Sequence, residues 1–227
     1  MEIQQHETSK ETERGASVSA LREWVAEAEE CSRRMNPKGS SAVLIPVLIR
    51  DGAYHVLYEI RASKLKTQPG EICFPGGRIE EGEEPLETAV REAMEELLIS
   101  REQIEVVGSL NRNDGPGGTF LYAFIGVLHD YNGTWSADEV DKVFTIPLDR
   151  ILETEPEIYR IRMKRQLPED FPYEYVPGGK EYHWRDQTNL IPFYPEFGKN
   201  PVLWGATARV TWAFARFLRA GRQGVSL

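Results

Sequence analysis

This chain is poor in cysteine, in positive charge and in long apolar runs, and each shortage excludes a class of protein. Its 2 cysteines among 227 residues, Cys31 and Cys73, make neither a disulfide framework nor a metal site on their own. Acidic residues outnumber basic ones by 36 to 27, a formal net charge of −9 that argues against nucleic-acid binding through a broad basic face. No apolar run approaches the roughly 18 residues of a membrane span, and the polar N-terminus has no secretory leader. We therefore expect a cytoplasmic protein that binds neither nucleic acid nor membrane.

The chain divides into a main domain and flanking segments. We expect a disordered polar tail over residues 1–16, an amphipathic helix and linker over 17–40, the main domain over 41–220 and a C-terminal tail over 221–227. A length of 227 residues suits one sizeable domain, with or without an appended subdomain.

Short apolar runs and turn residues predict the strands and helices of the main domain. The predicted strands cover residues 42–49, 54–60, 104–110, 119–128, 143–147 and 159–163. Asp51-Gly52 predicts a hairpin turn between the first two strands. Helical spacing predicts helices over 85–97 and 206–219, the second ended by Gly221, and a helical turn over 149–152. Residues 164–197 have little periodicity, which leaves a substrate-covering excursion and a partly mobile one as alternatives.

Residues 77–99 read GRIEEGEEPLETAVREAMEELLI and carry the strongest chemical signal. On a helix over 85–97, Glu92 and Glu96 lie one above the other at the edge of the apolar stripe, while Glu95 lies further toward solvent. Carboxylates four residues apart repel each other unless a cation compensates, and Mg²⁺ prefers oxygen ligands. We therefore predict Glu92 and Glu96 as metal ligands, with Glu95 as a third ligand or acting through water. Taken singly, each glutamate fits an ordinary solvated helix face equally well.

Two segments before this helix suit the same chemistry. Gly76 and Gly77 allow backbone φ angles that other residues avoid, and they could present a carbonyl oxygen to a metal. Arg61, Lys64 and Lys66 form a basic cluster in an acidic chain, directly before the glycines. Such a cluster beside a metal site suits a polyphosphorylated substrate. The alternatives are a simple turn and a solvated basic loop.

The spacing from Gly77 onward resembles the Nudix box, G-x5-E-x7-R-E-U-x-E-E-x-G-U with U aliphatic, the signature of Mg²⁺-dependent pyrophosphate hydrolases. The match has one departure, Leu98 in place of the last glycine. That glycine ends the helix in a left-handed conformation, which costs a leucine about 1 kcal/mol or more. We therefore expect the helix to continue and to end near Ser100.

The resemblance implies a fold and roles for individual residues. The implied fold is α/β, a Nudix fold with a mixed β-sheet sandwiched between helices (α/β/α), here with an extra N-terminal helix. In such a site the Gly76 carbonyl would bind the metal, Arg91 would orient the glutamate beside it, and Glu83 would support the loop.

Residues 57–77, LYEIRASKLKTQPGEICFPGG, are similar to the motif that precedes the box in coenzyme A pyrophosphatases of the Nudix superfamily, L-L-T-x-R-[SA]-x3-R-x3-G-x3-F-P-G-G. Tyr58 and Glu59 depart from the expected Leu-Thr. Lys66 stands where the motif has arginine, which keeps the charge but loses the bidentate fork. Trp204–Arg209 resembles the WG-x-TAR segment of the same group.

Hydrolysis also needs an acceptor for the proton of the attacking water. Nudix enzymes often carry an additional acidic residue in the loop before the strand over 143–147, and Glu139 is our candidate there. Glu95 is the rival candidate, and a charged surface turn is the plain alternative for Glu139.

The sequence thus predicts hydrolysis of the pyrophosphate bond of coenzyme A or an acyl-CoA, giving 4′-phosphopantetheine and adenosine 3′,5′-bisphosphate. Mg²⁺ or Mn²⁺ would polarise a phosphoryl oxygen and activate the attacking water. The expected partner is a small CoA-like nucleoside diphosphate, and a homodimer is compatible with the sequence. Two alternatives stay open: a pyrophosphatase for another nucleoside diphosphate derivative such as ADP-ribose, and a non-catalytic Nudix-fold nucleotide sensor.

Overall fold

The computed structural model describes residues 38–110, 113–114, 119–184, 187–198 and 201–223. The predicted tail over 1–16, the N-terminal helix and most of the loop over 111–118 lie outside the described residues. None of the described helices is both long and apolar enough to span a membrane.

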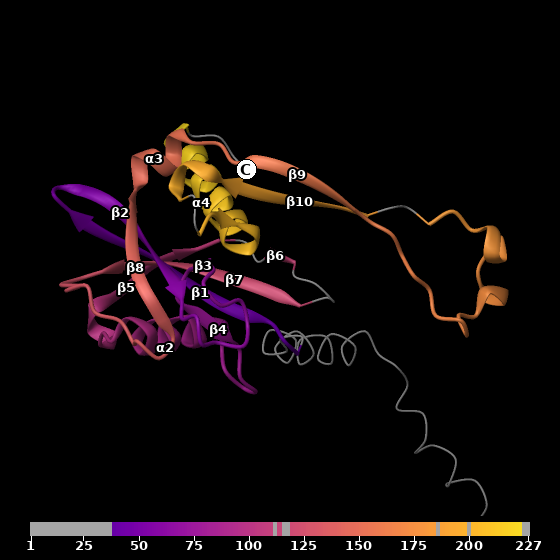
Figure 1. Cartoon of the computed structure of the whole chain (residues 1–227), viewed down its shortest axis with the longest axis horizontal. Coiled ribbons are helices and arrows are strands. Elements are labelled where there is room, and N and C mark those ends of the chain that lie inside the picture. Colours follow the sequence, from indigo (N-terminus) through magenta and orange to yellow (C-terminus); the bar gives the residue numbers. More distant parts are fainter. Residues whose placement is uncertain (1–37, 111–112, 115–118, 185–186, 199–200, 224–227) are drawn as a thin grey trace, which may run out of the picture.

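An eight-stranded mixed sheet forms the centre of the molecule (Figure 1). Its continuous path runs β3-β2-β1-β7-β5, with β4 paired to β1, β6 to β7 and β8 to β2. β1 and β7 run parallel, and the other pairs are antiparallel. The strands are β1 (Ser41–Arg50), β2 (Ala53–Arg61), β3 (Ile72–Cys73), β4 (Gly76–Arg78), β5 (Ile104–Ser109), β6 (Asn113–Asp114), β7 (Phe120–Leu128) and β8 (Val140–Pro147).

The five strands predicted for this sheet are confirmed, with one boundary moved, whereas the short strands β3, β4 and β6 were not predicted. The β1–β2 hairpin turns at Asp51 and Gly52, which both have positive φ, of 51° and 75°, as a tight hairpin between right-twisted strands requires. β8 begins at Val140 rather than Val143, because it continues along β2 past an irregularity at Ile60 and Arg61. The end of β2 therefore lies beside the start of β8.

Helices cover both faces of the sheet. α2 (Pro85–Leu97) lies below it in Figure 1, and α3 (Leu148–Glu153) and α4 (Gly205–Gln223) lie above it. Neighbouring residues on β1 point to opposite faces, so Leu44 packs into the core on the α2 side and Ile45 into the core on the α4 side. The expected sheet sandwiched between helices is confirmed.

The predicted end of the last helix is wrong. α4 continues to Gln223, so Gly221 lies inside it. A glycine ends a helix by adopting a left-handed conformation, and Gly221 does not have positive φ. An internal glycine costs a helix only about 1 kcal/mol relative to alanine, which the packed length of α4 tolerates.

A second, three-stranded antiparallel sheet carries a long arm. It consists of β9 (Glu157–Met163), β10 (Gln187–Tyr194) and β11 (Leu203–Trp204) in the order β11-β10-β9. β9 is confirmed, whereas sequence periodicity did not reveal β10. Between them, residues 164–184 extend the arm away from the body and include two short 3-10 helices, Tyr173–Tyr175 and Gly179–Glu181 (Figure 1).

Candidate metal centre and active site

The three glutamates of α2 differ in burial as the helical projection predicts. Glu96 is buried, with 2% of its surface exposed, Glu92 is half-buried, and the Glu95 side chain is 57% exposed. Glu96 therefore lies between the helix and the sheet, whereas Glu95 lies toward solvent.

Strand β4 brings two glycines against the buried carboxylates. The Gly76 N–H donates a hydrogen bond of 2.8 Å to Glu96 Oε2. A Cβ on Gly77 would come closer than 3.0 Å to the carboxylate of Glu92, and a Cβ on Gly76 would come equally close to the backbone of Ala42. Real Cβ atoms do not approach other atoms so closely, so Gly76 requires glycine because backbone lies against it, whereas any larger residue at position 77 would displace the Glu92 carboxylate.

Arg91 links the loop before α2 to one of the carboxylates. Its Nε and Nη2 donate to the two carboxylate oxygens of Glu83 at 2.9 and 3.2 Å, and its Nη1 donates to Glu92 Oε1 at 2.8 Å. Its contact with Glu95 Oε2 is longer, at 3.5 Å. The Arg91 guanidinium lowers the pKa of Glu83 to about 2. These contacts match the orienting role that the family resemblance implies for this arginine.

The loop that carries Glu139 is fastened to the end of α2. The Ser136 N–H donates to the Glu96 carbonyl at 2.8 Å, and the Thr134 hydroxyl donates to the Leu97 carbonyl at 2.7 Å. The last carbonyls of a helix have no partner within it, so these bonds satisfy the end of α2. They also hold the following loop, and with it Glu139, above the helix.

Three carboxylates converge at this point. Ligand oxygens of Glu92, Glu96 and Glu139 all lie within 4.8 Å of one another, and Glu95 is not part of the group. Burial raises the pKa of Glu96 to about 8, and the neighbouring charges of Glu92 and Glu139 add to the rise. Burial also raises the pKa of Glu92, which Arg91 opposes. Converging carboxylate oxygens that repel one another fit a hard divalent cation such as Mg²⁺ or Mn²⁺.

The expected continuation of α2 to Ser100 is wrong. The helix ends at Leu97, and Leu98 adopts the left-handed conformation with φ 53° and ψ 49°. The Ile99 N–H donates to the Met94 carbonyl at 3.2 Å, as in a glycine-capped helix end. The loop bonded to the last carbonyls fixes this end, so Leu98 accepts a conformational cost of roughly 1–2 kcal/mol.

The predicted substrate-binding residues occupy different surroundings. Arg61 lies near enough to the carboxylates for its positive charge to lower the pKa of Glu96, and its Nε donates to the Thr67 carbonyl at 3.3 Å. Lys64 forms an exposed ion pair with Asp138, at 2.6 Å. Lys66 is exposed, and the described part of the chain holds no hydrogen bond or ion pair for it. The structure thus brings Arg61 near the site, pairs Lys64 with Asp138 and leaves Lys66 exposed.

Sequence reasoning missed one residue beside the site. Glu59 departs from the upstream motif, and the sequence predicts no functional role for it. It has 0% of its surface exposed and interacts with Glu96. The sequence does contain a signal for it. Glu59 is a charged residue in a strand that is buried on both faces, since Leu57 and Tyr58 pack into opposite cores, and a buried charge needs a partner.

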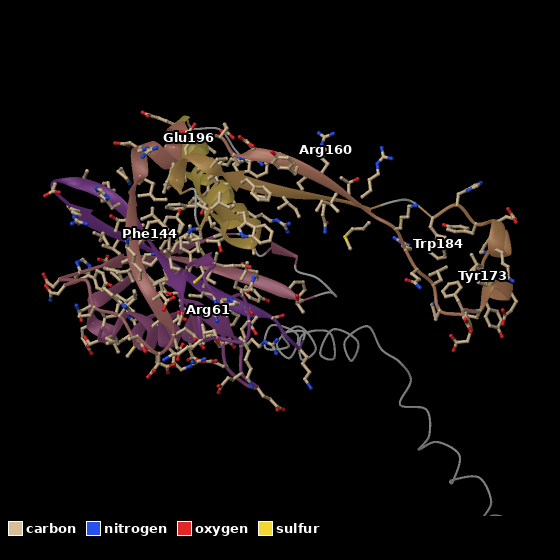
Figure 2. All side chains as sticks on the ribbon, in the orientation of Figure 1. Arg61, Phe144, Arg160, Tyr173, Trp184 and Glu196 are labelled. Atoms are coloured by element: carbon tan, nitrogen blue, oxygen red, sulfur yellow. The ribbon has the colours of Figure 1, made fainter. Side chains whose placement is uncertain are left out.

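The arm lies away from this site. Figure 2 shows Arg61 in the body and Tyr173 and Trp184 at the far end of the arm. The aromatic rings at this end contact one another, with Phe171 near Tyr173 and Trp184, and Tyr182 near Trp184. The described residues of the arm, 164–184, therefore do not cover the site of their own chain.

The part of the chain that forms the sheet and the carboxylate helix, residues 40–169, matches the NUDIX domain family. The chain belongs to the NUDIX family. Its mixed sheet between helices is the NUDIX fold, and α2 with the preceding loop is its Nudix box.

Two curated relatives of this NUDIX protein illustrate the similarity. It is 32% identical to the peroxisomal coenzyme A diphosphatase NUDT7 of Mus musculus over 171 residues, 74% of this chain and 66% of that protein. It is 37% identical to Nudix hydrolase 3 of Caenorhabditis elegans over 134 residues, 56% of each. The matched region is thus less than two thirds of either relative. Among solved structures, a Nudix hydrolase from M. smegmatis, RenU, has a TM-score of 0.43 and 24% identity, covering 51% of this chain and 74% of that one.

Proposed function

We propose that this chain is a metal-dependent pyrophosphohydrolase that cleaves the pyrophosphate bond of coenzyme A or an acyl-CoA. The observation that carries the proposal is the convergence of Glu92, Glu96 and Glu139 beside the glycines of β4. A Mg²⁺ or Mn²⁺ ion held by these carboxylates would supply positive charge that polarises a phosphoryl oxygen of the substrate. The resemblance adds the Gly76 carbonyl as a further ligand.

The surrounding residues hold the carboxylates in place. Arg91 fixes Glu92 through a charge-assisted bond of 2.8 Å, and the Gly76 N–H fixes Glu96 through another of 2.8 Å. Such orienting bonds determine how well a carboxylate binds a metal. A non-catalytic sensor has no need for three converging carboxylates, so this arrangement favours an enzyme.

Two acids are candidates for the proton acceptor. Glu139 is the exposed member of the three-carboxylate group, so it can exchange a proton with an attacking water and with solvent. Glu95 is also exposed but lies outside the group and contacts Arg91. We favour Glu139 as the base, with Glu95 as a residue that acts through water.

Two observations support coenzyme A as the substrate class. Residues 57–77 resemble the upstream motif of coenzyme A pyrophosphatases, and the charge of Arg61 from this motif acts on Glu96. A guanidinium in this position suits a diphosphate. One relative is a coenzyme A diphosphatase by name. The expected products are 4′-phosphopantetheine and adenosine 3′,5′-bisphosphate.

The test compares coenzyme A with ADP-ribose under Mg²⁺ and under Mn²⁺, with products identified by mass spectrometry in ¹⁸O water. We expect coenzyme A to be cleaved faster and ¹⁸O to enter one product only. Faster cleavage of ADP-ribose would show that coenzyme A is not the preferred substrate, while the proposed reaction, hydrolysis of a pyrophosphate bond, would stand. Binding of either compound without any product, with metal present, would overturn the enzymatic proposal in favour of a sensor.

A further inference from the structure

A fourth carboxylate lies deeper than the three already described. Glu59 is in β2, a strand that pairs with β3 through Cys73 and with β8 through Val143. It is fully buried, and its Oε1 has no hydrogen-bond partner within the described residues. Its other oxygen, Oε2, is 3.9 Å from the Cys73 sulfur, a weak donor at most.

The Glu59 side chain faces the metal centre. Residues two apart on a strand share a face, so Glu59 lies on the side of Leu57, which packs with α2. Glu59 interacts with the carboxyl group of Glu96, and the charges of Arg61 and Glu139 also act on it. Glu59 is therefore a buried carboxylate on the face of the sheet that carries the metal centre, and one of its oxygens, Oε1, has no hydrogen-bond partner within the described residues.

The local charges are unbalanced. Four carboxylates meet here, and two guanidinium groups lie beside them. Arg91 is bonded to Glu83 as well as to Glu92, and Arg61, whose charge acts on Glu59 and Glu96, donates its Nε to the Thr67 carbonyl. Buried carboxylates are retained where they are paired or coordinate a metal.

We propose that Glu59 is an additional metal ligand of this centre and shares a divalent cation with Glu96. Two-metal sites that bridge a phosphate are known in hydrolytic enzymes, and a fourth carboxylate provides the oxygen that a second cation needs. The inference rests on the metal-dependent function proposed above. The upstream motif has threonine at this position, so the additional carboxylate distinguishes this chain from the motif it otherwise resembles.

The experiment measures Mn²⁺ binding to the full chain by titration calorimetry and by electron paramagnetic resonance of free Mn²⁺, without substrate. Glu59→Gln keeps the size of the side chain and removes its charge, and Glu59→Thr restores the residue of the motif. Glu153→Gln, an exposed glutamate on α3, is the matched control for loss of one negative charge. We expect both Glu59 variants to lose one Mn²⁺ equivalent or to bind it roughly tenfold or more weakly, and the control to bind as the wild type does.

Unchanged stoichiometry and affinity in a folded Glu59 variant would overturn the proposal and leave Glu59 as a protonated structural group. Folding is checked by the melting temperature of the metal-free variants, and Glu59→Thr serves if Glu59→Gln does not fold. Because this experiment measures metal binding and not turnover, its outcome is independent of the proposed hydrolase activity. If the Glu59 variants lose a Mn²⁺ equivalent while the wild type cleaves no diphosphate, Glu59 is a metal ligand and the proposed activity is wrong.

Discussion

The β-strands of this chain are stabilised in two different ways in the body and in the arm. In the body, β1 and β2 are buried on both faces, and the site residues are bonded to several elements at once. In the arm, every residue of β9 is exposed, and the far end is held by its own ring contacts and by Arg165 over Trp184. A two-stranded ribbon alone is marginally stable in water. Substitutions at the site should therefore affect metal binding and the stability of the body, whereas substitutions in the arm should leave the stability of the body unchanged.

The largest effect is expected from Glu96→Gln. The substitution removes the central charge of the carboxylate group, so we expect turnover to fall by about 10³-fold, corresponding to several kcal/mol of transition-state stabilisation. The fold should be retained, because the buried carboxylate already has a raised pKa and glutamine avoids burying a charge. Steady-state kinetics and a thermal melt measure the two effects. Near-wild-type turnover would refute the metal site.

Gly77→Ala tests how tightly β4 is packed against the carboxylates. The added Cβ would overlap the carboxylate of Glu92, so we expect metal affinity to fall by roughly 10- to 100-fold and stability by about 1–3 kcal/mol. Gly221→Ala is the matched control, since a Cβ there meets nothing within 4 Å. This control should raise stability by about 0.5–1 kcal/mol, because alanine favours a helix more than glycine does. If calorimetry and chemical denaturation show equal effects for the two substitutions, the close packing of β4 against Glu92 does not matter for metal binding or stability.

The pH dependence of metal binding gives a smaller effect. Glu96 has a raised pKa of about 8 in the metal-free protein, and the proton competes with the cation below that pH. Mg²⁺ affinity should therefore rise by up to about tenfold per pH unit below 8 and level off above it. The contribution of Glu96 to metal-free stability has the opposite sign: it is complete below the ordinary pKa of 4.5 and is lost as pH rises through about 8. Calorimetry and thermal melts across this range measure both, and a pH-independent affinity would contradict the assignment.

The smallest effect is expected from shortening the arm. Replacing residues 166–184 by a Gly-Asn-Gly turn removes the ring cluster without touching β9 or β10. Stability of the body should change by less than about 0.5 kcal/mol, since the removed contacts are distant from either core. Turnover should also be retained. A large rise in KM for coenzyme A would revive the alternative that the excursion covers a substrate.

Much of the site could be predicted from local sequence. The spacing of Glu92, Glu95 and Glu96 on a helix with one apolar face predicts their order of burial, because a helix has a fixed period. The same residues with Gly76 and Gly77 indicate the family. The positions of β1, β2 and α2 follow from apolar runs bounded by turns.

Other features depend on contacts between distant segments. β10 has little periodicity of its own and forms by pairing with β9. Leu98 is left-handed because Thr134 and Ser136 bond the preceding carbonyls. The ion pair between Lys64 and Asp138 joins residues far apart in the chain.

The sequence by itself determined the family, the long strands of the central sheet and the carboxylates of α2, because these are recorded in spacing within short segments. Only the tertiary structure decided which acids meet. Glu139 joins Glu92 and Glu96 because its loop bonds to the end of α2, while Glu95 stays outside. Glu59 interacts with Glu96 because β2 presents it on the face of the sheet that α2 covers. Contacts between acids so far apart in the sequence depend on how the sheet and the helix pack, so they cannot be predicted from the spacing of residues within one segment.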